Sequence, residues 1–237
     1  MRVEIWSDVV CPWCYIGKRH LESALARFEH GDEVEVLWRS FELDPGAPVE
    51  REGGYTARLA AKYRVTEAEA EAMVDRMTRV GDDVGVDMRF DRARPGNTFD
   101  AHRLLHLAQE VGLQDALKER LLAATFTEGR PIGRLETLVE VAVEAGLDDA
   151  GSRAVLTGDR FAAEVRADER QARTLGISSV PFFVIDRTYG APGAQHPDVL
   201  LDLLRRAWAE GGESSAPATA PTPTVGDEAC AGDACAV

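Results

Sequence analysis

The sequence predicts an α/β fold in which a long helical segment interrupts a small sheet. A strand, a helix and a second strand follow one another within residues 1–44. Helical periods then fill residues 45–176, and an apolar strand pattern returns in residues 177–210. The middle stretch is too long for a loop, so we interpret it as a helical insertion within the sheet domain.

The first part reads as a βαβ unit. Apolar and polar residues alternate over residues 2–7 and again over 34–41, as in strands. Between them an amphipathic helix is expected from about Pro12 to His30, with Gly31 as its stop. The right-handed crossover rule then predicts that the two strands pair in parallel.

The insertion is expected to contain several helices separated by Gly, Pro or Asp clusters. Thr66 with Glu69, and Thr98, are residue types that cap helix N-termini. The helical segments lie near residues 54–63, 66–80, 98–111, 113–127, 133–146, 151–156 and 159–175.

The last part returns to the sheet. Val180–Asp186 is an apolar run typical of a buried strand, and residues 189–194 predict a turn with a short edge strand. A final helix is expected from Pro197 to Ala209. Gly, Ser, Ala, Pro and Thr then dominate residues 211–237, which we expect to be a disordered tail.

The motif with the clearest chemistry is the dithiol Cys11 and Cys14, with Pro12 and Trp13 between the two cysteines. It stands where a strand gives way to a helix, and a helix N-terminus favours an anion. We therefore expect a thiolate at Cys11, with Cys14 one turn further on to resolve a mixed disulfide. A zinc site would need further ligands, and so short a loop makes a poor structural disulfide, so redox chemistry without a metal is predicted.

Composition narrows the function further. The chain has 237 residues, 45% of them hydrophobic, and a net charge of −14. Such acidity argues against nucleic-acid binding, and no apolar stretch or signal pattern indicates a membrane span or export. A cytoplasmic protein is expected, where a disulfide is more often transient and catalytic than structural.

Four segments carry a family resemblance: SDVVCPWCYIGK, NTFDAHRLLH, FTEGRPIG, and SSVPFFVID followed by GAQ. Together they resemble the FrnE group of DsbA-like oxidoreductases, which is grouped with 2-hydroxychromene-2-carboxylate isomerases and kappa-class glutathione transferases. The resemblance covers about residues 1–210. It implies a thioredoxin fold of DsbA-type topology with a large helical insertion.

The resemblance also implies roles for single residues. Cys11 matches the exposed nucleophile, Cys14 the resolving cysteine, and Pro181 the proline after a cis peptide. Such a turn would lay the backbone of Val180 beside the dithiol as an edge for a substrate peptide. An ordinary proline at a strand start is the alternative. Trp13 replaces the histidine of the DsbA pattern, which predicts a weaker oxidant than DsbA.

Other candidates keep two interpretations each. His102 and His106 lie four apart on a predicted helix and could bind a metal, but no third ligand is evident and packing is favoured. Asn97, Thr98 and Arg103 belong to the family-like stretch. They suit either contact with a glutathione or substrate group, or a helix cap and a surface ion pair.

The tail holds a second cysteine pair, Cys230 and Cys235, beside acidic residues. Some FrnE-type proteins are similar in carrying such a pair, which implies a second redox-active dithiol. A flexible tail could return it to the first dithiol as a thiol relay. Acidic neighbours raise a thiol pKa and weaken that case. Metal scavenging or no function are the alternatives.

The leading hypothesis is a thiol–disulfide oxidoreductase acting on protein or small-molecule thiols and disulfides. It needs no cofactor beyond its redox-active disulfide, with glutathione as an optional co-substrate, and a homodimer stays open. The first alternative is a glutathione-dependent isomerase or transferase, although a resolving Cys14 is useful chiefly for exchange. The second is a non-catalytic redox or metal sensor or holdase.

Overall fold

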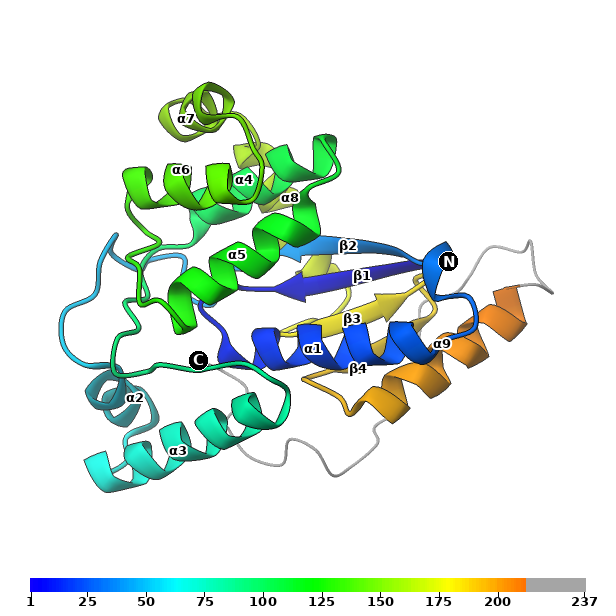
Figure 1. Ribbon diagram of the computed structural model, residues 1–237, viewed down its shortest axis with the longest axis horizontal. Helices are drawn as coiled ribbons and strands as arrows, with labels where there is room; N and C mark the ends of the chain where they lie inside the picture. Colours follow the sequence, from blue (N-terminus) through cyan, green and yellow to red (C-terminus); the bar gives the residue numbers. More distant parts are fainter. Residues whose placement is uncertain (212–237) are drawn as a thin grey trace.

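The computed structural model describes residues 1–211, which form a four-stranded mixed sheet with flanking helices (Figure 1). In the sheet the spatial order is β2-β1-β3-β4. β1 and β2 are parallel, whereas β3 runs antiparallel to both β1 and β4. This confirms the predicted α/β class and the parallel first pair. The strands are β1 (Arg2–Ser7), β2 (Glu35–Ser40), β3 (Phe182–Ile185) and β4 (Tyr189–Pro192).

Helices cover both faces of the sheet because successive strand residues point to opposite sides. Val3 and Ile5 of β1 pack in one cluster with α1 (Pro12–Arg27) and α9 (Pro197–Gly211). Trp6, on the opposite face, packs with Val184 and with residues of and after α8. The sheet is thus buried on both sides, as its apolar strand β3 indicates.

The predicted insertion lies between β2 and β3 and is helical in each of the predicted segments. Figure 1 shows α2 and α3 as a group apart from α4–α8, and α1 contacts both α3 and α5. The helices are α2 (Tyr55–Tyr63), α3 (Glu67–Asp83), α4 (Phe99–Glu110), α5 (Gln114–Phe126), α6 (Leu135–Glu144), α7 (Asp149–Thr157) and α8 (Ala162–Thr174).

Most helix ends lie close to where the local sequence signals predict them, but some differ. Thr66 and Glu69 form the predicted capping box at the start of α3. Thr98 holds the predicted N-cap position of α4, but its side chain makes no capping hydrogen bond within residues 1–211. Instead, the Phe99 N–H donates to Asn97 Oδ1 at 3.0 Å. The first helix ends at Arg27 rather than His30.

Two expectations concern the chain as a whole. No helix within residues 1–211 is long and apolar enough to cross a membrane. The predicted tail and its cysteines, Cys230 and Cys235, lie outside the described residues.

Candidate active site

The dithiol occupies the start of α1, as predicted. Cys11 is the N-cap residue with extended backbone (φ −98°, ψ 113°), and Pro12 begins the helix. Proline suits this position because its missing N–H is not needed there. The Cys14 N–H donates to the Cys11 carbonyl at 3.1 Å, and both cysteines are free thiols.

Both thiols are buried, which contradicts the expectation of an exposed nucleophile at Cys11. Neither cysteine has exposed surface, and both pack in a cluster with Trp6, Val180 and Val184. The Cys11 thiol also donates to the Val180 carbonyl at 3.5 Å. Cys11 is therefore covered by a segment far along the chain, and a substrate must displace that cover to reach the sulfur.

The Val180–Pro181 peptide bond is cis, as the resemblance implied. Helix α1 comes close to this loop because of Gly17. A Cβ at Gly17 would lie 2.9 Å from Pro181 Cγ, nearer than a Cβ tolerates, and a tight 3.3 Å from Phe183 Cζ. Glycine here lets the helix that carries the dithiol pack directly against the loop.

The two thiols share a hydrogen bond, so their pKa values shift in opposite directions. Burial raises the pKa of Cys11 well above its ordinary value, and the hydrogen bond and negative charge of Cys14 raise it further. Burial also opposes ionisation of Cys14, but the hydrogen bond from Cys11 and the charge of Lys118 outweigh it and lower its pKa. The resting dithiol thus favours the charge at Cys14, whereas the sequence predicted it at Cys11.

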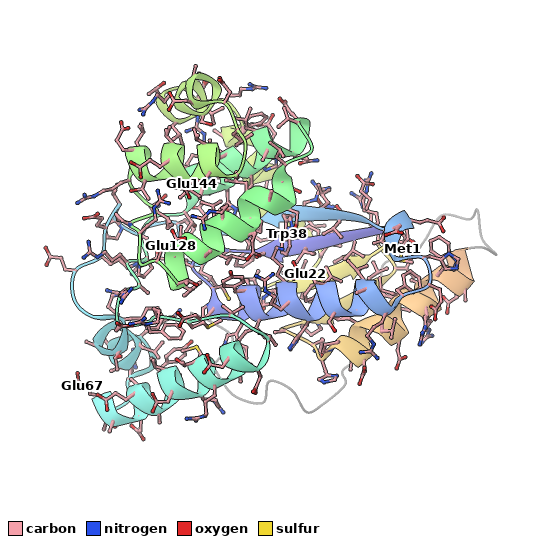
Figure 2. The ribbon with its side chains drawn as sticks, viewed as in Figure 1. Met1, Glu22, Trp38, Glu67, Glu128 and Glu144 are labelled. Carbon is pink, nitrogen blue, oxygen red and sulfur yellow. The ribbon has the colours of Figure 1, made fainter. Side chains whose placement is uncertain are left out.

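Lys118 of α5 supplies the cation near the dithiol. It is fully buried, and its Nζ has no hydrogen-bond partner within residues 1–211. Nζ lies 5.3 Å from the ring centroid of Trp38 on β2, where α5 crosses the sheet (Figure 2). Burial lowers the pKa of Lys118, although the negative charges of Cys14 and Asp8 oppose the change.

Asp8 completes the buried group three residues before Cys11. Its Oδ1 accepts from the Val9 N–H at 2.8 Å, and its Oδ2 accepts from the Leu43 N–H at 2.8 Å. Oδ1 also lies 3.3 Å from His102 Nε2. Burial alone would raise the pKa of Asp8, but the His102 contact and the Leu43 N–H outweigh it, so Asp8 stays a carboxylate.

The two predicted histidines are brought to different carboxylates. His102 contacts Asp8, whereas His106 Nε2 lies 3.2 Å from both Ser40 Oγ and Asp168 Oδ2. In the described part of the chain, no group of three or more His, Cys, Asp or Glu side chains is arranged to hold a metal. The geometry assigns both histidines to buried polar packing around the sheet.

Asn97 and Arg103 also serve the fold. Asn97 Nδ2 donates to the Ala47 carbonyl at 3.2 Å while its Oδ1 caps α4. Arg103 is buried and donates to the carbonyls of Gly158, at 2.7 Å, and Arg160, at 2.9 Å. Arg103 thereby holds the chain that follows α7. Thr98 lines a pocket that lies on the dithiol side of the sheet, and Asn97 and Arg103 are not part of that lining.

That pocket adjoins the dithiol and has a volume of about 330 Å³. It is bounded by the junction of β1 and α1, the segment after β2, helix α2 and the loop before α4. Its lining residues are Asp8, Val10, Leu43, Asp44, Arg51, Tyr55, Arg58, Leu59, Lys62, Pro95, Gly96 and Thr98.

Sequence reasoning missed the charged residues around the dithiol. Asp8 could have been found, because it stands inside the segment that carries the motif. Lys118 gives no such signal, since a lysine between Leu117 and Glu119 resembles any surface lysine of an amphipathic helix.

Comparison with known proteins places this site in a wider context. The chain matches the family described as DSBA-like thioredoxin domain over residues 2–205. It is also similar to a probable DsbA oxidoreductase from Streptomyces coelicolor, at 46% sequence identity and a TM-score of 0.85. That match covers 100% of this chain and 99% of the other.

Two more distant structures share the fold. The cytosolic disulfide reductase DsbM from Pseudomonas aeruginosa with GSH is 19% identical, with a TM-score of 0.62 and coverage of 88% of this chain and 100% of that one. A 2-hydroxychromene-2-carboxylate isomerase is 13% identical, with a TM-score of 0.64 and coverage of 91% and 100%. At such identities the likeness concerns the fold alone.

Proposed function

Since this chain belongs to the DSBA-like thioredoxin family and is a DsbA-type disulfide oxidoreductase, we propose that Cys11 and Cys14 are its reacting groups, with Cys11 attacking and Cys14 resolving. The observation that carries the proposal is a free dithiol at a helix start, coupled by a hydrogen bond and lying near a buried cation. A purely structural pair would not need Lys118, whose burial without a hydrogen bond costs stability.

The exchange has two steps. The Cys11 thiolate attacks one sulfur of a substrate disulfide, which forms a mixed disulfide and releases the first substrate thiolate. The Cys14 thiolate then attacks the Cys11 sulfur, which forms the Cys11–Cys14 disulfide and releases the second thiolate. Two electrons pass from the dithiol to the substrate, and the reverse steps oxidise a substrate dithiol.

The buried charges assist each step. The hydrogen bond between the thiols lets the negative charge pass from Cys14 to Cys11, where the backbone N–H of Cys14 and the helix N-terminus favour it. Lys118 then stabilises Cys14 as it ionises for the resolving attack. Trp13, between the two cysteines, and the carbonyl of Val180 border the reacting sulfurs.

The substrates we propose are protein or small-molecule thiols and disulfides, with glutathione as a co-substrate and the cytoplasm as the site of action. The free thiols of Cys11 and Cys14 support this assignment, because in a reducing compartment a cysteine pair is more often catalytic than structural. A glutathione-dependent isomerase would need one group to hold the glutathione thiol, and Cys14 would have no part in it.

The test is the catalysed reduction of insulin disulfides with dithiothreitol or glutathione as reductant. The wild type is expected to turn over, and Cys14→Ser to lose turnover because its mixed disulfide is not resolved. Equal turnover in the two proteins would refute the resolving role of Cys14. No turnover in either would redirect attention to isomerase assays.

The tail pair is a separate proposal. Cys230 and Cys235 lie outside the described residues, and we propose that they relay electrons to the Cys11–Cys14 pair. Replacing both tail cysteines by serine is expected to slow turnover with the reductant while leaving single-turnover exchange at Cys11 unchanged. Unchanged turnover would remove the relay.

A further inference from the structure

The pocket beside the dithiol carries positive charge that thiol–disulfide exchange itself does not use. Val10 lines the pocket and directly precedes Cys11, so the pocket wall continues into the backbone of the attacking residue. The negative charge of a Cys11 thiolate also acts on Tyr55 and Lys62 across the pocket. A ligand in the pocket therefore lies beside the backbone that leads into Cys11, within electrostatic range of a Cys11 thiolate.

Two cations of the pocket have no carboxylate partner. Arg51 pairs with Asp44, and Asp8 accepts two backbone N–H groups. Arg58 and Lys62 form no ion pair within residues 1–211. The lining therefore holds three cations, Arg51, Arg58 and Lys62, against the two carboxylates Asp8 and Asp44. A net positive pocket in a chain with a net charge of −14 indicates an anionic ligand.

The pocket also holds hydrogen-bond donors without acceptors. Tyr55 is only 6% exposed, and its hydroxyl has no hydrogen-bond partner in the described part of the chain. Arg58 donates through Nη1 to the Gly53 carbonyl, while its buried Nη2 has no hydrogen-bond partner among residues 1–211. Buried donors of this kind are normally satisfied, so a ligand with acceptor oxygens is the missing partner.

We propose that this pocket binds the carboxylate of a small thiol or disulfide whose sulfur reacts with Cys11. Arg58 Nη2 and the Tyr55 hydroxyl are covered in the free protein, and they turn towards the carboxylate and donate hydrogen bonds to it as the ligand enters. Lys62 adds attraction at longer range. A volume of about 330 Å³ suits a small molecule. The inference rests on the proposed exchange function and adds a substrate class to it.

The experiment measures the rate at which the reduced full-length protein reacts with two small disulfides of similar size. One, 3,3′-dithiodipropionate, carries two carboxylates, and the other, 2-hydroxyethyl disulfide, is neutral. Arg58→Gln is expected to slow the anionic disulfide about tenfold, the worth of a hydrogen bond to a charged group. The neutral disulfide is expected to change less than about twofold, because the variant leaves the thiols intact.

Two further variants make the result specific. Lys62→Gln, at an exposed position, is expected to slow the anionic disulfide by about threefold at low salt and the neutral one less, because the lysine also attracts the Cys11 thiolate. Arg76→Gln removes the same charge from an exposed position of α3 outside the pocket, and it is expected to change neither rate.

The outcomes separate the two proposals. Wild-type protein that reacts with neither disulfide overturns the exchange function and the pocket assignment together. Wild-type protein that reacts with both, while Arg58→Gln slows both equally or neither, leaves exchange standing and overturns the carboxylate site. Selective loss of the anionic disulfide in both pocket variants supports the site.

Discussion

Positive charge reaches the dithiol from two sides, and the two sides differ in their exposure to water. Lys118 of α5 is fully buried on one side, whereas Arg58 and Lys62 of α2 line an open pocket on the other. A buried charge acts on its neighbours with little screening, so Lys118 affects any thiolate that forms nearby. Charges in a pocket open to solvent are screened, so they act chiefly on a ligand that comes into contact with them.

The comparison teaches that the inserted helices have two separate tasks. Helix α1 and its N-cap residue supply the two sulfurs. Helix α5 tunes the reactivity of the thiols, and helix α2 favours certain substrates. Changes to α5 should therefore alter reaction with every disulfide, and changes to α2 should alter reaction chiefly with anionic ones.

The largest predicted effect is a loss of stability on replacing Asp168, a buried charge that neither tunes the thiols nor binds substrate. Asp168 of α8 accepts from the Ser40 N–H at 2.9 Å and pairs with Arg39 at 3.1 Å. Asp168→Ala leaves these partners unsatisfied and is expected to cost about 3–5 kcal/mol of unfolding free energy, measured by urea denaturation. Exchange per folded molecule should stay unchanged, and a lower rate per folded molecule would contradict the division of tasks.

The same residue predicts a pH dependence. Burial opposes ionisation of Asp168, but His106, the Ser40 N–H and Arg39 outweigh it, so its pKa lies below the ordinary value. A lowered folded-state pKa gives stability that is present above the unfolded pKa, about 3.9, and is lost as the pH falls through the folded value. The wild type should lose stability below about pH 4, and Asp168→Asn should lose less there.

For Lys118→Met we expect a smaller change in the free energy of unfolding, in the stabilising direction. Replacing a buried ammonium by an apolar side chain should raise stability, by about 1 kcal/mol or more, while raising the pKa of Cys14. Exchange should slow about tenfold for a shift of one pKa unit, equally with neutral and anionic disulfides. Thiolate absorbance as a function of pH measures the pKa, and the exchange rates with the neutral and the anionic disulfide are measured beside it. If Lys118→Met slowed only the anionic disulfide, Lys118 would act on the substrate as Arg58 and Lys62 do, and the proposed difference between α5 and α2 would be wrong.

Much of this architecture could be predicted from the sequence because its signals are local. The strand, the C-x-x-C turn and the amphipathic helix follow one another, and Val180–Pro181 begins an apolar strand. The errors concern residues whose burial depends on contacts with segments distant in the sequence. Cys11 was expected to be exposed, yet it contacts Val180, 169 positions away. Lys118 gave no signal because its burial depends on α5 packing against β2.

The sequence prediction and the structure disagree most on which of the two cysteines carries the negative charge. The helix N-terminus favours a thiolate at Cys11, whereas burial raises the pKa of Cys11 and Lys118 lowers that of Cys14. We reconcile the two by transfer of the charge along the hydrogen bond between the thiols as a substrate displaces the Val180 carbonyl.

Peptide mapping of mixed disulfides in the two single-serine variants tests this assignment most directly. Cys14→Ser and Cys11→Ser would each react with 2-hydroxyethyl disulfide, be quenched with acid and be digested for mass spectrometry. Mapping separates these adducts from any at Cys230 or Cys235. We predict that Cys14→Ser forms an adduct at Cys11 faster than Cys11→Ser forms one at Cys14. An equal or faster adduct at Cys14 would contradict the account.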